Sequence, residues 1–243
     1  MTTPVPATMF ADPAPAERLE RATTALMAHG FTVEILDDAA AARARVKDLI
    51  PEGASVFTGA SETLRLSGIE EDINASGRYD AIKPRVLAMD RATQMDEIRR
   101  LVASPDVVVG SVAAVTETGS LVVASASGSQ LPAYAGGGAR AIWIAGAQKV
   151  VPDLRTALRR VEDHALPLES PRPSGLRAAQ RHQPPSHPQR GTLPRARHRP
   201  AAPRGRRILI TPGPAARGCR AWWRCAGVPC RRSRPGRRPA TAP

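Results

Sequence analysis

Glu117 is the residue of this chain whose surroundings most resemble those of a catalytic acid. It is the only Asp or Glu between Asp106 and Asp153, and it lies in an otherwise apolar stretch. A carboxylate desolvated in this way has a raised pKa and can do acid–base chemistry. Alternatively, it caps a neighbouring backbone segment or meets a buried arginine, and the sequence favours neither interpretation. Thr118 and Gly119 follow in the same loop and are candidate ligand-binding residues.

A second polar loop, at residues 58–63, could hold an anion. A glycine permits a tight turn there, and a serine together with free backbone N–H groups could bind a phosphate or a carboxylate. The simpler interpretation, which we favour, is a turn that caps the next helix. The candidate ligand-binding residues of this loop are Gly59, Ser61, Glu62 and Thr63.

Three other sites carry weaker signals. The glycine-rich run at residues 135–140 lacks the spacing of a phosphate loop, so we interpret it as a connection. Lys149 follows an apolar run and is a candidate anion contact, although a lone lysine is more often simply solvated. His29 and His164 fall within or at the ends of predicted helices, and we interpret both as structural.

The elements that must position these residues alternate between helix and strand. Apolar runs predict strands at residues 31–35, 55–59, 106–110, 121–123 and 141–146. Capping residues and apolar spacing predict helices that begin near Asp12, Ala39, Ser61, Thr93 and Pro152. In the last of these, the apolar face consists of Leu154, Leu158 and Val161. This alternation predicts an α/β fold with a mostly parallel sheet flanked by helices, whose ligands bind beyond the carboxyl ends of the strands.

Charge divides the 243-residue chain into two unlike parts. Residues 1–170 contain all 22 acidic residues and 17 basic ones, whereas residues 171–243 contain 18 Arg, no Lys and no acidic residue. We therefore expect a flexible N-terminus at residues 1–14 and one domain at residues 15–170. Residues 171–243 hold 14 of the 24 prolines and few apolar residues, which predicts a disordered basic tail.

Cysteine use and hydropathy bound the possible chemistry further. Cys219, Cys225 and Cys230 all lie in the tail, with spacing that does not match a zinc site, so we expect no metal. The start of the chain lacks the features of a signal peptide, and no apolar run is long enough to cross a bilayer. These features predict a cytoplasmic protein.

Three segments resemble the LUD domain of lactate-utilisation proteins, with lactate utilisation protein C as the closest type. They are TGASETLRLSGI at Thr58–Ile69, VGSVAAVTETGSLVV at Val109–Val123 and IAGAQKVVPDLRTALRRVEDHALPL at Ile144–Leu168. The resemblance covers about residues 15–170. It implies a fold related to sugar-phosphate isomerases, coenzyme A transferases and the 5-formyltetrahydrofolate cyclo-ligase.

The resemblance also implies a role in the oxidation of L-lactate to pyruvate, beside iron–sulfur partner proteins. The absence of cysteine from residues 1–170 agrees with a component that itself carries no cofactor, more a non-redox part of the system than a self-contained enzyme. Two alternatives remain. One is binding of nucleic acid or another anionic surface through the Arg-rich tail, for which specific recognition of nucleic acid is not expected. The other is a stand-alone enzyme of the isomerase or cyclo-ligase type.

The resemblance stops after Glu169, where the family continues with an acidic or neutral stretch, a further strand and a short Pro-Gly-containing end. The Arg, Pro, Ala and Gly that replace it here all have GC-rich codons. One hypothesis is therefore that the tail is the product of a shifted reading frame. On that basis we expect a domain that lacks its last strand and has an exposed sheet edge.

Overall fold

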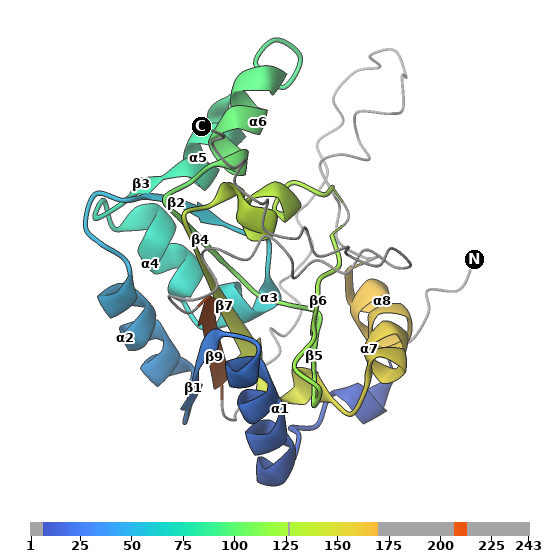
Figure 1. Cartoon of the computed structure of the whole chain (residues 1–243). Helices are drawn as coiled ribbons and strands as arrows, with labels where there is room; N and C mark the ends of the chain where they lie inside the picture. Colours follow the sequence, from blue (N-terminus) through green and yellow to red (C-terminus); the bar gives the residue numbers. More distant parts are fainter. Residues whose placement is uncertain (1–6, 126, 170–206, 213–243) are drawn as a thin grey trace, which may run out of the picture.

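The predicted α/β class is confirmed by the computed structural model of the chain, which describes residues 7–125, 127–169 and 207–212 (Figure 1). The strands of this part are β1 (Phe31–Leu36), β2 (Ser55–Thr58), β3 (Asp80–Ala81), β4 (Val107–Gly110), β5 (Ala114–Thr116), β6 (Leu121–Val122), β7 (Arg140–Gly146), β8 (Val150–Val151) and β9 (Arg207–Pro212). Its α-helices are α1 (Ala16–Ala28), α2 (Ala39–Leu49), α3 (Glu62–Leu66), α4 (Ile69–Ala75), α5 (Ile82–Ala88), α6 (Met95–Ala103), α7 (Leu154–Arg160) and α8 (Leu166–Glu169). Shorter helical turns are η1 (Thr8–Phe10), η2 (Ala133–Gly137), η3 (Ala147–Lys149) and η4 (Val161–Ala165).

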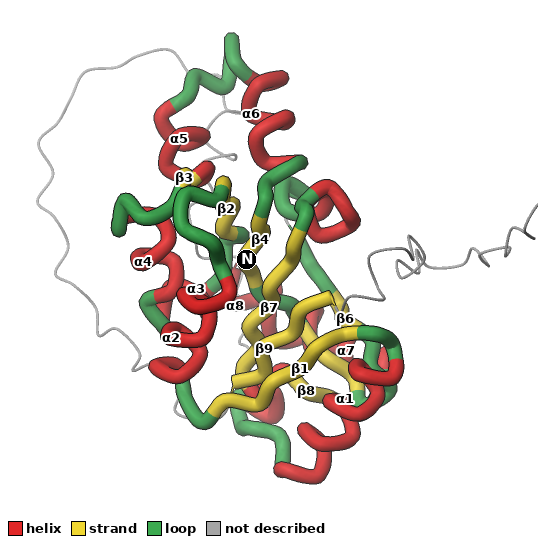
Figure 2. Tube along the Cα trace, turned by 60° about the vertical axis from the view of Figure 1, so that its left-hand side comes forward, coloured by secondary structure: helices red, strands yellow, loops and turns green. Residues whose placement is uncertain are grey.

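The main sheet has the strand order β1-β9-β7-β4-β2-β3 within the described residues (Figure 2). Strands β3, β2, β4 and β7 are parallel to one another, as predicted. The exception is β9, which runs antiparallel to both β1 and β7. The loops that follow β2, β4 and β7 therefore all lie at one edge of the sheet, called here the carboxyl edge.

Strand β9 corrects the expectation that the domain ends at residue 170 without a last strand. Ile208, Leu209 and Ile210 are fully buried, and each pairs with β1 on one side and β7 on the other. Three consecutive apolar residues stabilise a strand that is covered on both faces, even inside an Arg- and Pro-rich segment. At these six residues the prediction of disorder is wrong, and no exposed edge remains between β1 and β7. The tail cysteines and the remaining tail residues lie outside the described residues.

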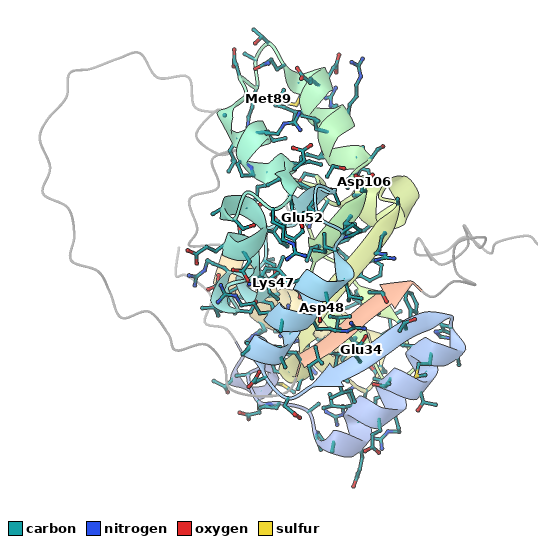
Figure 3. All side chains as sticks on the ribbon, turned by 90° about the vertical axis from the view of Figure 1, so that its left-hand side faces the viewer. Glu34, Lys47, Asp48, Glu52, Met89 and Asp106 are labelled. Carbon is teal, nitrogen blue, oxygen red and sulfur yellow. The ribbon has the colours of Figure 1, made fainter. Side chains whose placement is uncertain are left out.

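The two faces of the sheet are covered by different helices, and alternate residues of each strand point to opposite sides. Ile208 and Ile210 belong to the core formed with α1, α5 and α6. Leu209 and Ile142 belong to the core formed with α2, α3 and α4. Helix α2 buries Ala42 and Val46 and keeps charged residues on its outer side, where Figure 3 labels Lys47 and Asp48.

A smaller sheet, of order β6-β5-β8, packs against η1 and α7. Asp153 caps α7 by accepting a hydrogen bond from the backbone N–H of Thr156 at 2.7 Å. The predicted apolar face of this helix is wrong, because Leu154 and Leu158 are 53% and 50% exposed. The buried face instead consists of Ala157 and Arg160. Because this face is the buried one, the guanidinium group of Arg160 lies against the small sheet, where it contacts the backbone of Ala113.

Candidate functional site

The carboxyl edge of the main sheet holds one of the predicted loops, at residues 58–63, and the predicted residue Lys149, each joined to the end of β4. The turn after β2 is joined to β4 by the backbone N–H of Gly59, which donates to the carbonyl oxygen of Val109 at 2.9 Å. Lys149, which lies after β7, reaches the turn after β4. Its ammonium group donates to Ser111 Oγ at 2.8 Å and to the carbonyl oxygen of Val112 at 2.9 Å.

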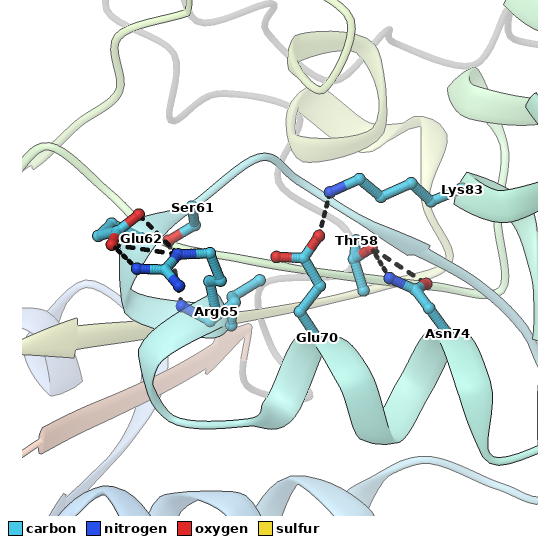
Figure 4. A network of polar contacts seen from close by, with 8 residues as sticks. Thr58, Ser61, Glu62, Arg65, Glu70, Asn74 and Lys83 are labelled. Carbon is cyan, nitrogen blue, oxygen red and sulfur yellow. Dashed lines mark hydrogen bonds and ion pairs between the residues drawn. The ribbon is translucent and has the colours of Figure 1, made fainter. Parts of the chain in front are cut away.

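The loop after β2 has the structure of a helix cap. Ser61 Oγ accepts a hydrogen bond from the backbone N–H of Leu64 at 3.4 Å, at the start of α3. Glu62 forms an ion pair with Arg65 one turn later. Figure 4 shows this pair in one view with the hydrogen bonds between Thr58 and Asn74. The favoured interpretation of this loop as a capping turn is confirmed, and ligand binding by Gly59, Ser61, Glu62 and Thr63 remains a proposal.

Lys149 is the predicted residue with the most unusual surroundings. Its side chain is partly buried and forms no ion pair with an acid of the described residues. Burial, followed by the positive charges of Arg160 and Arg207, lowers the pKa of Lys149 to about 7, against an opposing effect of the Glu169 carboxylate. The simpler expectation of a solvated lysine is therefore wrong.

Arg160 belongs to the same site and is not among the residues predicted from the sequence. Its side chain is 3% exposed, and its Nη1 and Nε donate to the carbonyl oxygens of Ala113 and Gln148 at 2.5 and 3.3 Å. Burial lowers the pKa of Arg160 to about 10. A signal was present in the sequence, because Ala157 and Arg160 are three residues apart on one face of α7, but the leucines of the opposite face obscured it.

Glu117 lies at a different place, at the end of β5 in the small sheet. Strand β8 starts directly after Lys149, and its two residues pair with Val115 and Thr116, so Lys149 and Glu117 lie at opposite ends of β8. The turn after β5 requires glycine at residue 119. Gly119 has φ +79°, and a Cβ there would lie 2.8 Å from the backbone of Ala25. The predicted site residues therefore form two groups, with Thr118 and Gly119 beside Glu117.

The carboxylate of Glu117 is held by two arginines of α1. Arg18 Nε donates to Oε1 at 2.7 Å, and Arg21 Nε donates to Oε2 at 2.6 Å. The hydrogen bond from Arg21, more than the one from Arg18, lowers the pKa of Glu117. The expectation of a raised pKa is therefore wrong, and the alternative of pairing with an arginine is the one that the structure shows.

The remaining sequence signals do not form a site at the carboxyl edge. Arg140 starts β7 at the opposite edge, where its Nη1 donates to the carbonyl oxygen of Leu49 at 2.7 Å. It lines an open hollow of about 480 Å³ together with Glu52 and Asp106. His29 and His164 each contact one backbone carbonyl, of Gly119 and Ala7. Among the described residues no group of three or more His, Cys, Asp or Glu could hold a metal ion.

Comparison with known proteins identifies the family of this chain. The protein-family profile described as LUD domain matches residues 19–187, which is more than half of the chain. The chain therefore belongs to the LUD domain family, a family linked to lactate utilisation. Comparison with curated proteins and comparison with solved structures each gave no match. In the part of the chain that the structure covers, no helix is both long and apolar enough to span a membrane.

Proposed function

We propose that this protein is the component of a lactate-oxidising system that carries no iron–sulfur cluster, and that it binds a small carboxylate or a phosphorylated ligand at the carboxyl edge. Membership of the LUD domain family supports the place in lactate utilisation. Residues 1–170 contain no cysteine, which supports placing the iron–sulfur clusters in partner proteins. Electrons from lactate would then pass to those iron–sulfur partners.

The observation that carries the ligand site is the position of the Lys149 ammonium group. It lies where the ends of β4 and β7 meet, which is where ligands bind in open α/β sheets. A partly desolvated ammonium attracts an anion more strongly than a solvated one, because water screens the charge less. Gly59 and Ser61 lie at the same edge, at the end of the neighbouring strand β2.

A growth experiment tests the assignment to lactate utilisation. A strain that lacks this gene, but keeps the genes for the iron–sulfur partners, should fail to grow on L-lactate. Expression of the wild-type chain should restore growth, whereas expression of Lys149→Met should not. The matched control is Lys47→Met, because Lys47 is an exposed lysine of α2 whose ion-pair partner is Asp72 of α4 rather than a residue of the proposed site. Unimpaired growth of the deletion strain would contradict the proposal.

A further inference from the structure

Helix α7 exposes the apolar side chains that the sequence predicts as its buried face. Leu154 and Leu158 are 53% and 50% exposed, and Val161, three residues further along, is partly buried. The helical backbone continues from α7 through η4 into α8, where Leu168 is 49% exposed. Single exposed leucines are common on protein surfaces, whereas a contiguous row of them is typical of a contact surface.

The spacing of this row is that of a coiled-coil seam. Leu154, Leu158 and Val161 are separated by four and then three residues, and Leu168 follows Val161 after seven more. Apolar residues with this alternation stay on one side of a helix, where they pack between the side chains of a second helix. The row is called here the leucine seam, defined as Leu154, Leu158, Val161 and Leu168.

The two sides of the leucine seam differ in character. On one side lie Ala157 and Arg160, which α7 buries against the small sheet. On the other side lie Arg155 and Glu162, which are both exposed and are about two helical turns apart. Neither of these two side chains forms an ion pair with a described residue. The acid nearest to Arg155 in sequence, Asp153, is occupied as the cap of α7.

A second copy of this helix matches both charges when it runs in the opposite direction. In an antiparallel pair related by a two-fold axis, Leu158 of each copy lies opposite Val161 of the other. Arg155 of each copy then faces Glu162 of the other, so two ion pairs form along the exposed side of the seam. Charges beside a seam select the orientation of the partner helix. The surface is therefore complementary to itself, as a two-fold interface requires.

A parallel pair lacks this match. A two-fold axis along the helices would turn the charged side of each copy towards the side of the other copy that its own domain covers. Access for the antiparallel copy is available, since α7 and α8 lie at the right-hand edge of the described part of the molecule in Figure 1.

We propose that the leucine seam is the interface of a homodimer, in which α7 of one copy packs antiparallel to α7 of a second copy. The inference goes beyond the proposed ligand site and does not depend on it. A contact between two short helices buries little surface, so the dimer should be weak, with a dissociation constant in the micromolar range.

Sedimentation velocity of the full chain at a series of concentrations tests the proposal. The wild-type chain should change from monomer to dimer as its concentration rises. Leu158→Asp should raise the dissociation constant at least about tenfold, because the dimer would then bury an unpaired carboxylate from each copy. Leu158 is half exposed, so this variant should keep its fold, which circular dichroism checks. The matched control is Leu87→Asp, because Leu87 is 67% exposed on α5, which lies apart from α7 in Figure 1.

Reversal of the two charges tests the antiparallel arrangement. Arg155→Glu and Glu162→Arg, each made alone, should raise the dissociation constant about fivefold, since like charges would face each other across the seam. The double variant should dimerise like the wild type, because the same pairs form with their signs exchanged. High salt should reduce the effect of each single reversal.

The outcomes decide between the occupants of the seam. A dimer that Leu158→Asp weakens, and that the double reversal restores, supports the proposal. A dimer that Leu158→Asp does not change overturns it, and a double reversal that restores nothing overturns the antiparallel arrangement. A chain that stays monomeric at every concentration also overturns it. The occupant is then residues 170–206 of the same chain if Leu158→Asp lowers the melting temperature, and a different protein if it does not.

Discussion

Asp72 of α4 is the carboxylate most strongly stabilised by its neighbours. Arg43 and Lys47 of α2 both pair with it, and the hydrogen bond from Arg43 is the main cause of its pKa of about 2. We expect Asp72→Asn to lower the free energy of unfolding by about 1 kcal/mol at pH 7, a value reduced because both cations are nearly half exposed. Thermal unfolding of the wild-type protein and of Asp72→Asn measures this difference.

The same pair should make stability depend on pH in one direction. The folded pKa of Asp72 is below its ordinary value of 3.8, so the stabilisation is complete above that value and is lost as the pH falls towards 2. The stability difference between wild type and Asp72→Asn should shrink over this range. Asp96→Asn is the control, because Asp96 is 82% exposed and should change little at any pH. A difference that persists at pH 2 would contradict this assignment.

Glu117 gives a prediction that separates a structural role from a role at the ligand site. Because it joins β5 to α1 through Arg18 and Arg21, Glu117→Gln should lower the unfolding free energy by about 1 kcal/mol. Phosphate binding should stay unchanged, because Lys149 and Glu117 lie at opposite ends of β8. Glu20→Gln, an exposed change on the same helix α1, serves as the control in both measurements. Loss of binding with unchanged stability would instead favour a direct role in function.

Among single residues, the sequence predicted those whose type stands out from their surroundings. Lys149 and Glu117 are isolated charges in apolar stretches, and both turned out to be firmly held by specific partners. What the sequence did not contain was the partner of each. Arg18 and Arg21, which hold Glu117, and Ser111 and Val112, which hold Lys149, come from other parts of the chain, and only the packing of the fold brings them close.

At the scale of elements, β9 gives the strongest prediction for stability. Leu209 is fully buried in the core formed with α2 and α4, so Leu209→Ala should cost about 2–5 kcal/mol by leaving a cavity. Thr211→Ala, in the same strand but only partly buried, should cost much less. Chemical denaturation of the two variants measures the difference. Equal, small effects would mean that β9 is not part of the folded sheet.

The contact between η2 and β4 gives another prediction at this scale. A Cβ on Gly110 would lie 1.5 Å from the hydroxyl oxygen of Tyr134 and 2.6 Å from its Cζ. Gly110→Ala should therefore destabilise the protein by about 1–3 kcal/mol, through strain. In a Tyr134→Phe background the cost should be smaller, because the closest atom is gone. Additive effects in a double-mutant cycle would show that the two residues do not meet.

Strands with a local apolar signal were predicted from the sequence, and β9 was not, for a physical reason. Its signal is only three apolar residues long, and the average over 73 residues of Arg, Pro and Ala conceals it. Its partners, β1 and β7, precede it by more than 60 residues, so no local pattern indicates the pairing. In α7 the leucines suggested the wrong face, because the small sheet accepts Ala157 and the stem of Arg160 instead.

For the whole molecule, β9 decides which part of the chain can fold alone. A chain that ends at residue 170 lacks the strand between β1 and β7, and we expect it to lose the cooperative thermal transition of the full chain. A chain that ends at Pro212 keeps the sheet order and should keep that transition. Differential scanning calorimetry compares them. A native-like transition in the shorter chain would contradict a structural role for β9.

The basic part of the chain, residues 171–243, contributes one arginine to the described structure. Of the 18 arginines after residue 170, Arg207 is the one that the structure places, buried in the sheet and paired with Leu36 of β1 and Gly146 of β7. The hypothesis of a shifted reading frame stays a hypothesis. Sequencing the coding DNA tests it, and it fails if no other frame encodes an acidic continuation after codon 169.

The position of β9 also sets the order of events at the ribosome. Strands β1 to β8 are made before β9. Until β9 is made, the strand that lies between β1 and β7 in the finished sheet is missing. Two strand edges with free N–H and C=O groups are exposed to other chains throughout that time. Closing the sheet requires contacts between the first strand and the last, the kind of long-range contact that slows folding. The main sheet of this protein can therefore be completed only after residues 207–212 have been made, late in the synthesis of the chain.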